Sequence, residues 1–95
     1  MLETLILVAA LSVNTLTDTE LETYYWDCDA AFMKGDLGGA DLNSCLAVTE
    51  ELQQRRFKGD REAFMQWWRT YNLPEWYKRG FTPRVDDLPK LRYKT

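Results

Sequence analysis

The chain has 95 residues, a length that suits one small domain with a marginal core. It contains no histidine, which excludes the commonest general base and the usual nitrogen ligand of zinc. The net charge of −3 conceals an asymmetry, because residues 1–54 carry −9 and residues 55–95 carry +6. This pattern predicts either that the two halves face each other within the fold or that each is a surface for charged partners.

The N-terminal segment, residues 1–16, is largely apolar. Its apolar run over residues 5–13 is about half as long as a membrane-spanning helix requires. Ala10 and Ser12 have the spacing of a signal-peptide cleavage site, whereas Glu3 and the absence of a basic residue before the run are atypical. The segment is predicted to be an export signal. A helix packed on the core, or a membrane contact through residues 5–13, is the alternative.

The first helix of the domain is predicted over residues 17–34. Thr17 and Glu20 have the spacing of a capping box, and Gly35 is suited to end the helix. One face of this helix carries an apolar stripe at helical spacing, consisting of Leu21, Tyr25, Cys28 and Phe32.

A second helix is predicted from an N-cap at Asp41 to about Phe57. Its apolar face holds Leu42, Cys45, Thr49 and Leu52, widened by Leu46 and Val48. A turn between the two helices brings their stripes together, so Cys28 and Cys45 are predicted to form a disulfide. Buried free thiols are the alternative, since two thiols without histidine make a poor zinc site and the pair is not a C-x-x-C motif.

A third helix is predicted to begin after an N-cap at Asp60 and to stop at Asn72–Pro74, with a short fourth helical turn over residues 75–79. Residues 83–95 are predicted to form a basic extended tail. The fold class is therefore all-α, a three-helix domain over residues 17–82 with a disulfide-stapled hairpin. The third helix carries the stripe Phe64, Trp67, Trp68 and Tyr71, and the predicted core is Leu21, Tyr25, Phe32, Leu42, Leu46, Leu52, Phe64 and Trp67.

Four short motifs occur in a fixed order along residues 17–70. They are Tyr25-Trp26-Asp27-Cys28-Asp29, the segment Cys45 to Leu52, Phe57-Lys58-Gly59-Asp60, and Trp67-Trp68. This order resembles a group of short, uncharacterised, exported proteobacterial proteins. The resemblance implies export, because such proteins typically begin with a signal peptide, and it implies no activity for any residue.

The acidic residues near the hairpin do not have the spacing of a known metal site. Asp27, Asp29, Asp36 and Asp41 lack the EF-hand spacing, and are interpreted as a helix cap at Asp41 and solvated side chains elsewhere. Glu50 and Glu51 have no second carboxylate fixed opposite them by the sequence pattern. No catalytic residue, metal ligand or cofactor is predicted, and the chain is predicted not to be an enzyme.

The predicted function is that of a small non-catalytic interaction protein, periplasmic or secreted, that binds a protein partner. One alternative is a cytoplasmic inhibitor or nucleic-acid mimic that uses the acidic first helix. Another is an accessory subunit of a membrane complex. Nucleic acid is disfavoured as a partner by the acidic first half. The predicted partner-binding surface consists of exposed aromatic and basic residues, namely Trp68, Trp76, Tyr77, Lys78, Arg79, Lys90 and Arg92.

Overall fold

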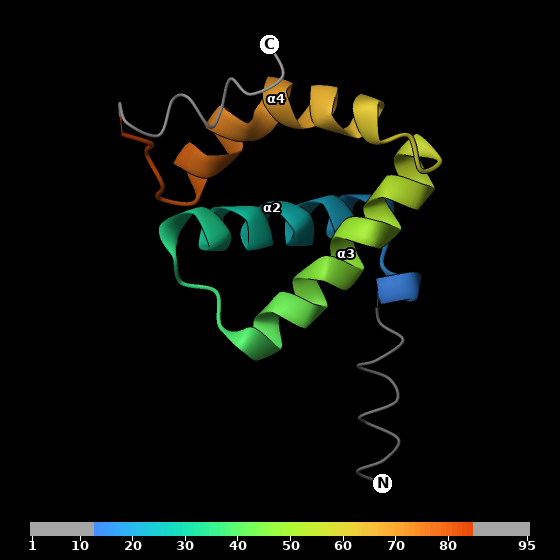
Figure 1. The fold of residues 1–95 in the computed structure, drawn as a ribbon, viewed down its shortest axis with the longest axis horizontal. Coiled ribbons are helices and arrows are strands. Elements are labelled where there is room, and N and C mark those ends of the chain that lie inside the picture. Colours follow the sequence, from blue (N-terminus) through green and yellow to red (C-terminus); the bar gives the residue numbers. More distant parts are fainter. Residues whose placement is uncertain (1–12, 85–95) are drawn as a thin grey trace, which may run out of the picture.

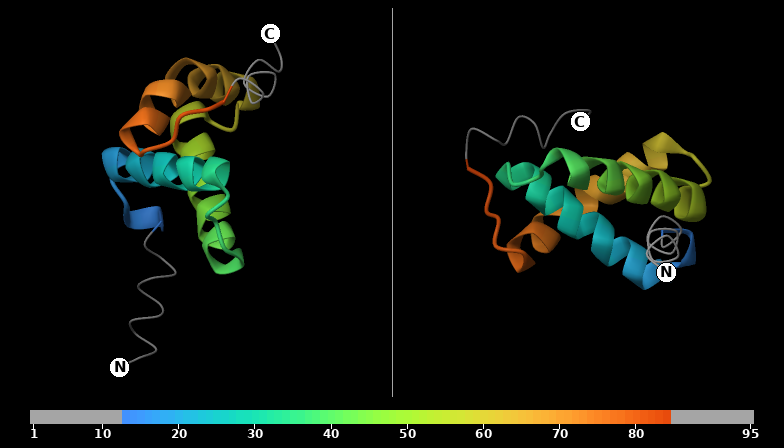
Figure 2. Two further views of the ribbon diagram at one scale, coloured as in Figure 1. Left: turned by 90° about the vertical axis from the view of Figure 1, so that its left-hand side faces the viewer. Right: turned by 90° about the horizontal axis from the view of Figure 1, so that it is seen from below.

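The computed structural model describes residues 13–84, whose fold is built from three long helices (Figure 1). They are α2 (Asp18–Lys34), α3 (Gly39–Phe57) and α4 (Arg61–Lys78), and residues 13–15 are also helical. The helix α4 lies over α2 in Figure 1, and the view from below in Figure 2 shows that the two helices cross at an angle. The helix α3 also crosses α2 obliquely (Figure 1). No strand occurs in this range, so the all-α prediction is confirmed.

Local sequence signals fix most helix ends. Thr17 Oγ1 accepts a hydrogen bond from the Glu20 N–H at 3.1 Å, and Glu20 Oε1 accepts one from the Thr17 N–H at 2.9 Å, which confirms the capping box. Gly35 ends α2 in the left-handed conformation at φ 79°. The N-cap predicted at Asp41 is wrong. The helix α3 begins at Gly39 after an N-cap at Gly38, and Asp41 lies in its first turn.

The helix α4 begins as predicted and ends later than predicted. Asp60 Oδ1 accepts a hydrogen bond from the Ala63 N–H at 3.1 Å, which confirms Asp60 as the N-cap. The helix then continues through Pro74 to Lys78, so the turn expected as a separate element is the last turn of α4. Proline costs the helix one backbone hydrogen bond. Residues that follow Pro74 contact α2, since Trp76 bonds Asp29 and Arg79 bonds Asp27. These contacts stabilise the last turn of α4.

The core lies where all three helices meet. It is a cluster of buried side chains around aromatic rings in contact, with ring centroids 5.0 Å apart for the tilted pair Trp26 and Trp67 and 5.6 Å apart for the edge-to-face pair Tyr25 and Phe64. The predicted burial of Leu21, Tyr25, Leu52 and Phe64 is confirmed, and Trp67 is half-buried at the edge of the cluster. The full cluster is Leu21, Tyr25, Trp26, Val48, Leu52 and Phe64.

Three residues predicted to be core are instead on the surface. Phe32 is 63% exposed, Leu46 53% and Leu42 41%, so their assignment to the core is wrong. These three side chains lie on the expected faces of α2 and α3, in the half of each helix nearer the turn that joins them. The two helices diverge toward that turn (Figure 1), so their apolar faces do not bury each other there. Tyr71, expected on the apolar stripe of the third helix, is also exposed.

Ion pairs join the acidic first half of the chain to the basic second half. Arg79 Nε lies 2.7 Å from Asp27 Oδ1, and Arg56 pairs with Glu22. Arg55 Nη1 also donates a hydrogen bond to the Leu16 carbonyl oxygen at 2.6 Å. These contacts favour the interpretation in which the two halves face each other within the fold. Residues 1–12 of the predicted signal segment and most of the predicted basic tail, including Lys90 and Arg92, lie outside the described residues, whereas Val13 and Leu16 pack against the core.

Candidate functional site

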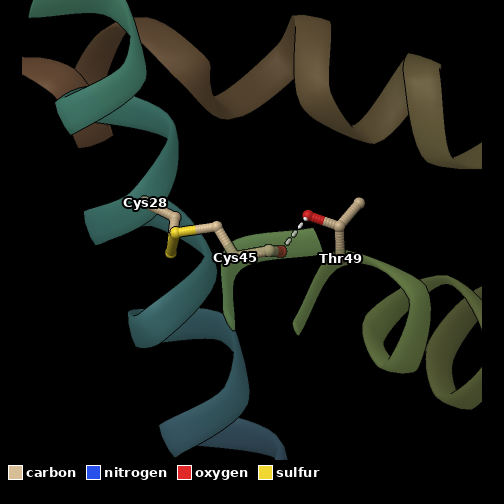
Figure 3. The surroundings of a disulfide bond; sticks show 3 residues. All are labelled: Cys28, Cys45 and Thr49. Carbon is tan, nitrogen blue, oxygen red and sulfur yellow. Dashed lines mark hydrogen bonds between the residues drawn. A yellow bond between two sulfur atoms is a disulfide. The ribbon is translucent and has the colours of Figure 1, made fainter. Parts of the chain in front are cut away.

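The disulfide Cys28–Cys45 joins the middle of α2 to the second turn of α3 (Figure 3). The two Cα atoms are 5.7 Å apart, within the range that a disulfide requires. The Cys45 carbonyl oxygen accepts a hydrogen bond from Thr49 Oγ1 at 2.8 Å, one turn later in α3 (Figure 3). The predicted bond between the two helices is therefore confirmed.

A pocket of about 240 Å³ opens beside this bond, between α2 and α3. We call it the disulfide pocket and define it by its apolar lining, which comes from Phe32 on α2, Leu37 in the turn, and Leu42 and Leu46 on α3, together with the disulfide. The three residues wrongly assigned to the core are thus gathered at one place. Exposed apolar side chains scattered singly are ordinary, whereas a cluster around a concavity is typical of a binding surface.

The polar side of the disulfide pocket is formed around Asp29. Its Oδ2 atom accepts two hydrogen bonds, from Trp76 Nε1 at 2.8 Å and from Trp68 Nε1 at 3.0 Å. The carboxylate therefore ties α2 to α4 while it also lines the pocket. No lysine or arginine among residues 13–84 forms an ion pair with it.

Burial changes the proton affinity of this group. It raises the pKa of Asp29 above its ordinary value, although hydrogen bonds from Trp76, Trp68 and Tyr25 act in the opposite direction. Burial also raises the pKa of the Tyr25 hydroxyl, and the nearby Asp29 charge adds to that shift. The interpretation of Asp29 as a solvated side chain is wrong. One sequence signal points to its position, since Asp29 follows Tyr25 by four residues and so shares its helix face.

The described residues predicted to form the partner-binding surface differ in exposure. Trp76 is 0% exposed, and Trp68 is half-buried with its indole N–H on Asp29. Arg79 is held by Asp27 and by Glu75, at 2.7 Å each. Tyr77 and Lys78 are exposed. Trp68 and Trp76 therefore lie together inside the fold, where both bind Asp29 on α2. The apolar lining of the disulfide pocket was not predicted as a site from the sequence.

The described residues hold no cluster of three or more histidine, cysteine, aspartate or glutamate side chains that is suited to bind a metal ion. Of the helices in this range, none has both the length and the apolar character needed to cross a membrane. The disulfide pocket offers an apolar surface with the carboxylate of Asp29 and the hydroxyl groups of Tyr25 and Thr49. This combination is suited to binding an apolar group.

Comparisons with known proteins do not identify the class. The chain matches no protein-family model, and no match is found among curated proteins or solved structures.

Proposed function

We propose that the chain is a small, non-catalytic protein-interaction module that binds a partner at the disulfide pocket. The observation that carries this proposal is the joint exposure of Phe32, Leu42 and Leu46 around one concavity. Covering a leucine or phenylalanine side chain contributes about 1.5–3 kcal/mol, so these residues could supply much of a binding energy. The disulfide favours a rigid surface here, because it fixes the two helices that form the walls.

The predicted alternative, an inhibitor that uses the acidic first helix, has less support. Three carboxylates of α2, those of Asp18, Glu22 and Asp27, already lie in ion pairs with arginines of this chain. A partner with a basic pocket would have to compete with those arginines. The third candidate, an accessory subunit held by residues 5–13, depends on a segment of which the structure describes only Val13, and Val13 packs against the core.

Site-specific photo-crosslinking in the native host tests the module. A benzophenone amino acid is placed at Leu46 in one strain and at Tyr77 in a second. The two side chains are similarly exposed, at 53% and 54%, but Leu46 lines the pocket and Tyr77 does not. We expect a crosslinked partner from position 46 that disappears when Phe32→Ser is added.

Crosslinks from position 77 alone would place the partner on the aromatic and basic surface predicted from the sequence. If neither position gave a crosslink, the proposal that the chain is a protein-interaction module would be overturned.

We further propose export to an oxidising compartment, periplasmic or secreted, where a disulfide persists. The Cys28–Cys45 bond and the resemblance to exported proteins support this. Non-reducing mass spectrometry of protein from the native host, after thiol alkylation, provides the test. We expect an oxidised chain that has lost residues 1–12, because the predicted cleavage site ends at Ser12. An intact Met1 with two alkylated thiols would instead indicate a cytoplasmic protein.

A further inference from the structure

The disulfide pocket combines an apolar lining with a carboxylate that has no cationic partner within residues 13–84. Burying an ionised carboxylate is costly unless hydrogen bonds or an opposite charge compensate it. For Asp29 the described compensation comes from neutral donors, namely Trp68, Trp76 and Tyr25. The negative charge itself is unmatched within residues 13–84.

Of the described residues that line the disulfide pocket, Asp29 is the one that carries a charge. The lysine nearest to it in sequence, Lys34, is not part of that lining and donates its hydrogen bond to the Arg79 carbonyl oxygen at 3.0 Å. The lining of the pocket is therefore complementary to an occupant that combines an apolar group with a positive charge.

We propose that the disulfide pocket binds a basic amphipathic segment of a partner protein, with an apolar side chain against Phe32, Leu42 and Leu46 and a lysine or arginine directed at Asp29. This inference rests on the proposed function and adds the chemistry of the partner. A pocket of about 240 Å³ is smaller than the roughly 300–1,000 Å³ of typical small-molecule sites, and an inserted side chain suits it better.

Charge argues against two other occupants. A second copy of the chain, docked symmetrically pocket to pocket, would bring its own Asp29 toward the same residue, and like charges would face each other. The apolar run over residues 5–13 of this chain has no basic residue to meet the carboxylate. The basic C-terminal residues 85–95 remain as an internal competitor, which the test must separate from an external partner.

Fluorescence anisotropy with three labelled peptides tests the inference. The peptides share one amphipathic leucine pattern and differ only in their polar positions, which are lysine, glutamine or glutamate. On the wild-type protein we expect the lysine peptide to bind about tenfold more tightly than the glutamine peptide, and the glutamate peptide to bind least. The preference for lysine should shrink when the salt is raised to about 1 M.

Three variants locate the binding. Leu46→Ser should weaken all three peptides, because it removes apolar lining. Asp29→Asn should weaken the lysine peptide and leave the glutamine peptide unchanged, because the amide keeps an acceptor for the indoles but carries no charge. Tyr77→Ser is the matched exposed control and should change none of the affinities. Circular dichroism checks that each variant is folded, and the comparison of peptides on wild-type protein stands if Asp29→Asn does not fold.

The possible failures are distinguishable. Equal binding of the lysine and glutamine peptides, lost in Leu46→Ser, would overturn the charge inference and leave the interaction module standing. If Leu46→Ser left the affinity for the lysine peptide unchanged, the peptide would bind elsewhere on the protein, and the disulfide pocket would not be the site. A chain ending at Arg84 that binds the lysine peptide more tightly than the full chain would make residues 85–95 the occupant. A dimer in sedimentation that Leu46→Ser dissociates would make a second copy the occupant.

Discussion

At the scale of single residues, Asp29 is the point at which α2 and α4 meet through side-chain hydrogen bonds. Its pKa is raised by burial, so the folded state binds its proton more tightly than the unfolded state does. The contribution of this group to the free energy of unfolding is therefore greatest below the unfolded pKa of about 3.9 and falls as the pH rises through the folded value.

Asp29→Asn should remove this pH dependence, because the amide does not titrate and can still accept from an indole N–H. The quantity to measure is the difference in free energy of unfolding between wild type and Asp29→Asn, from urea unfolding followed by tryptophan fluorescence between about pH 3 and 8. We expect the wild type to lose stability relative to the variant as the pH rises. Other carboxylates titrate in both proteins and cancel, so a flat difference would contradict the raised pKa.

Trp76 and Tyr77 are neighbours in sequence with opposite roles. Trp76 is completely buried against α2 and contacts Trp68, with ring centroids 5.8 Å apart, whereas Tyr77 is 54% exposed. Trp76→Ala should therefore cost about 3–5 kcal/mol of unfolding free energy, as large aromatic truncations in cores do. Tyr77→Ala should change it by no more than about 0.5 kcal/mol. If both variants lost similarly little unfolding free energy, Trp76 would lie on the exposed surface, as the sequence alone predicts.

At the scale of elements, the disulfide fixes the hairpin of α2 and α3 across a sequence separation of 17 residues. Replacing both Cys28 and Cys45 by serine should lower the free energy of unfolding by about 2–4 kcal/mol, since the bond restricts the unfolded chain. Reduced wild-type protein is the control and should unfold like the double variant. No loss in the double variant would mean that the core alone orients the two helices.

The helix α4 makes a prediction through Pro74, which lies inside it. Pro74→Ala restores a backbone N–H that can bond one turn back, while it also gives the unfolded chain more freedom. We expect a net stabilisation of about 1–2 kcal/mol in thermal or urea unfolding, because an interior proline costs a helix about 3 kcal/mol. Destabilisation would instead indicate that the helix stops at Asn72–Pro74, as the sequence alone predicts.

Where sequence reasoning succeeded and failed at this scale follows from the range of the forces involved. Capping by Thr17 and Asp60 is local, so the starts of α2 and α4 were predictable. The continuation of α4 past Pro74 depends on Trp76 packing against another helix, which no local pattern encodes. The helical period identifies an apolar face but not how far along the helix a neighbour covers it, and Phe32 and Leu46 were misassigned for that reason.

At the scale of the whole molecule, the unequal charge of the two halves is used largely inside the fold. Ion pairs run from Asp18, Glu22 and Asp27 on α2 to Arg55 and Arg56 on α3 and Arg79 at the end of α4. The charge asymmetry is visible in the sequence. The ion-pair partner of each charged residue cannot be predicted from it, because pairing depends on how α3 and α4 cross α2. Asp29, the carboxylate that lines the disulfide pocket, takes no part in this pairing within residues 13–84.

Arg79 tests this use of charge, because it bonds Asp27 on α2 and Glu75 on its own helix at once. The pKa of Glu75 is lowered in spite of its burial, because Arg79 and Lys78 donate hydrogen bonds to its carboxylate. Arg79→Gln should lower the free energy of unfolding by about 1 kcal/mol at low salt, more than an isolated surface pair contributes. Lys58→Gln is the control, since Lys58 forms no ion pair within residues 13–84, and it should have almost no effect. Salt at about 1 M shortens the Debye length to about 3 Å, so the difference in unfolding free energy between the two variants should be smaller at that salt concentration. If Arg79→Gln and Lys58→Gln lowered the free energy of unfolding equally at low salt, the ion pairs of Arg79 would not stabilise the fold. Arg79 would then be available to bind a partner.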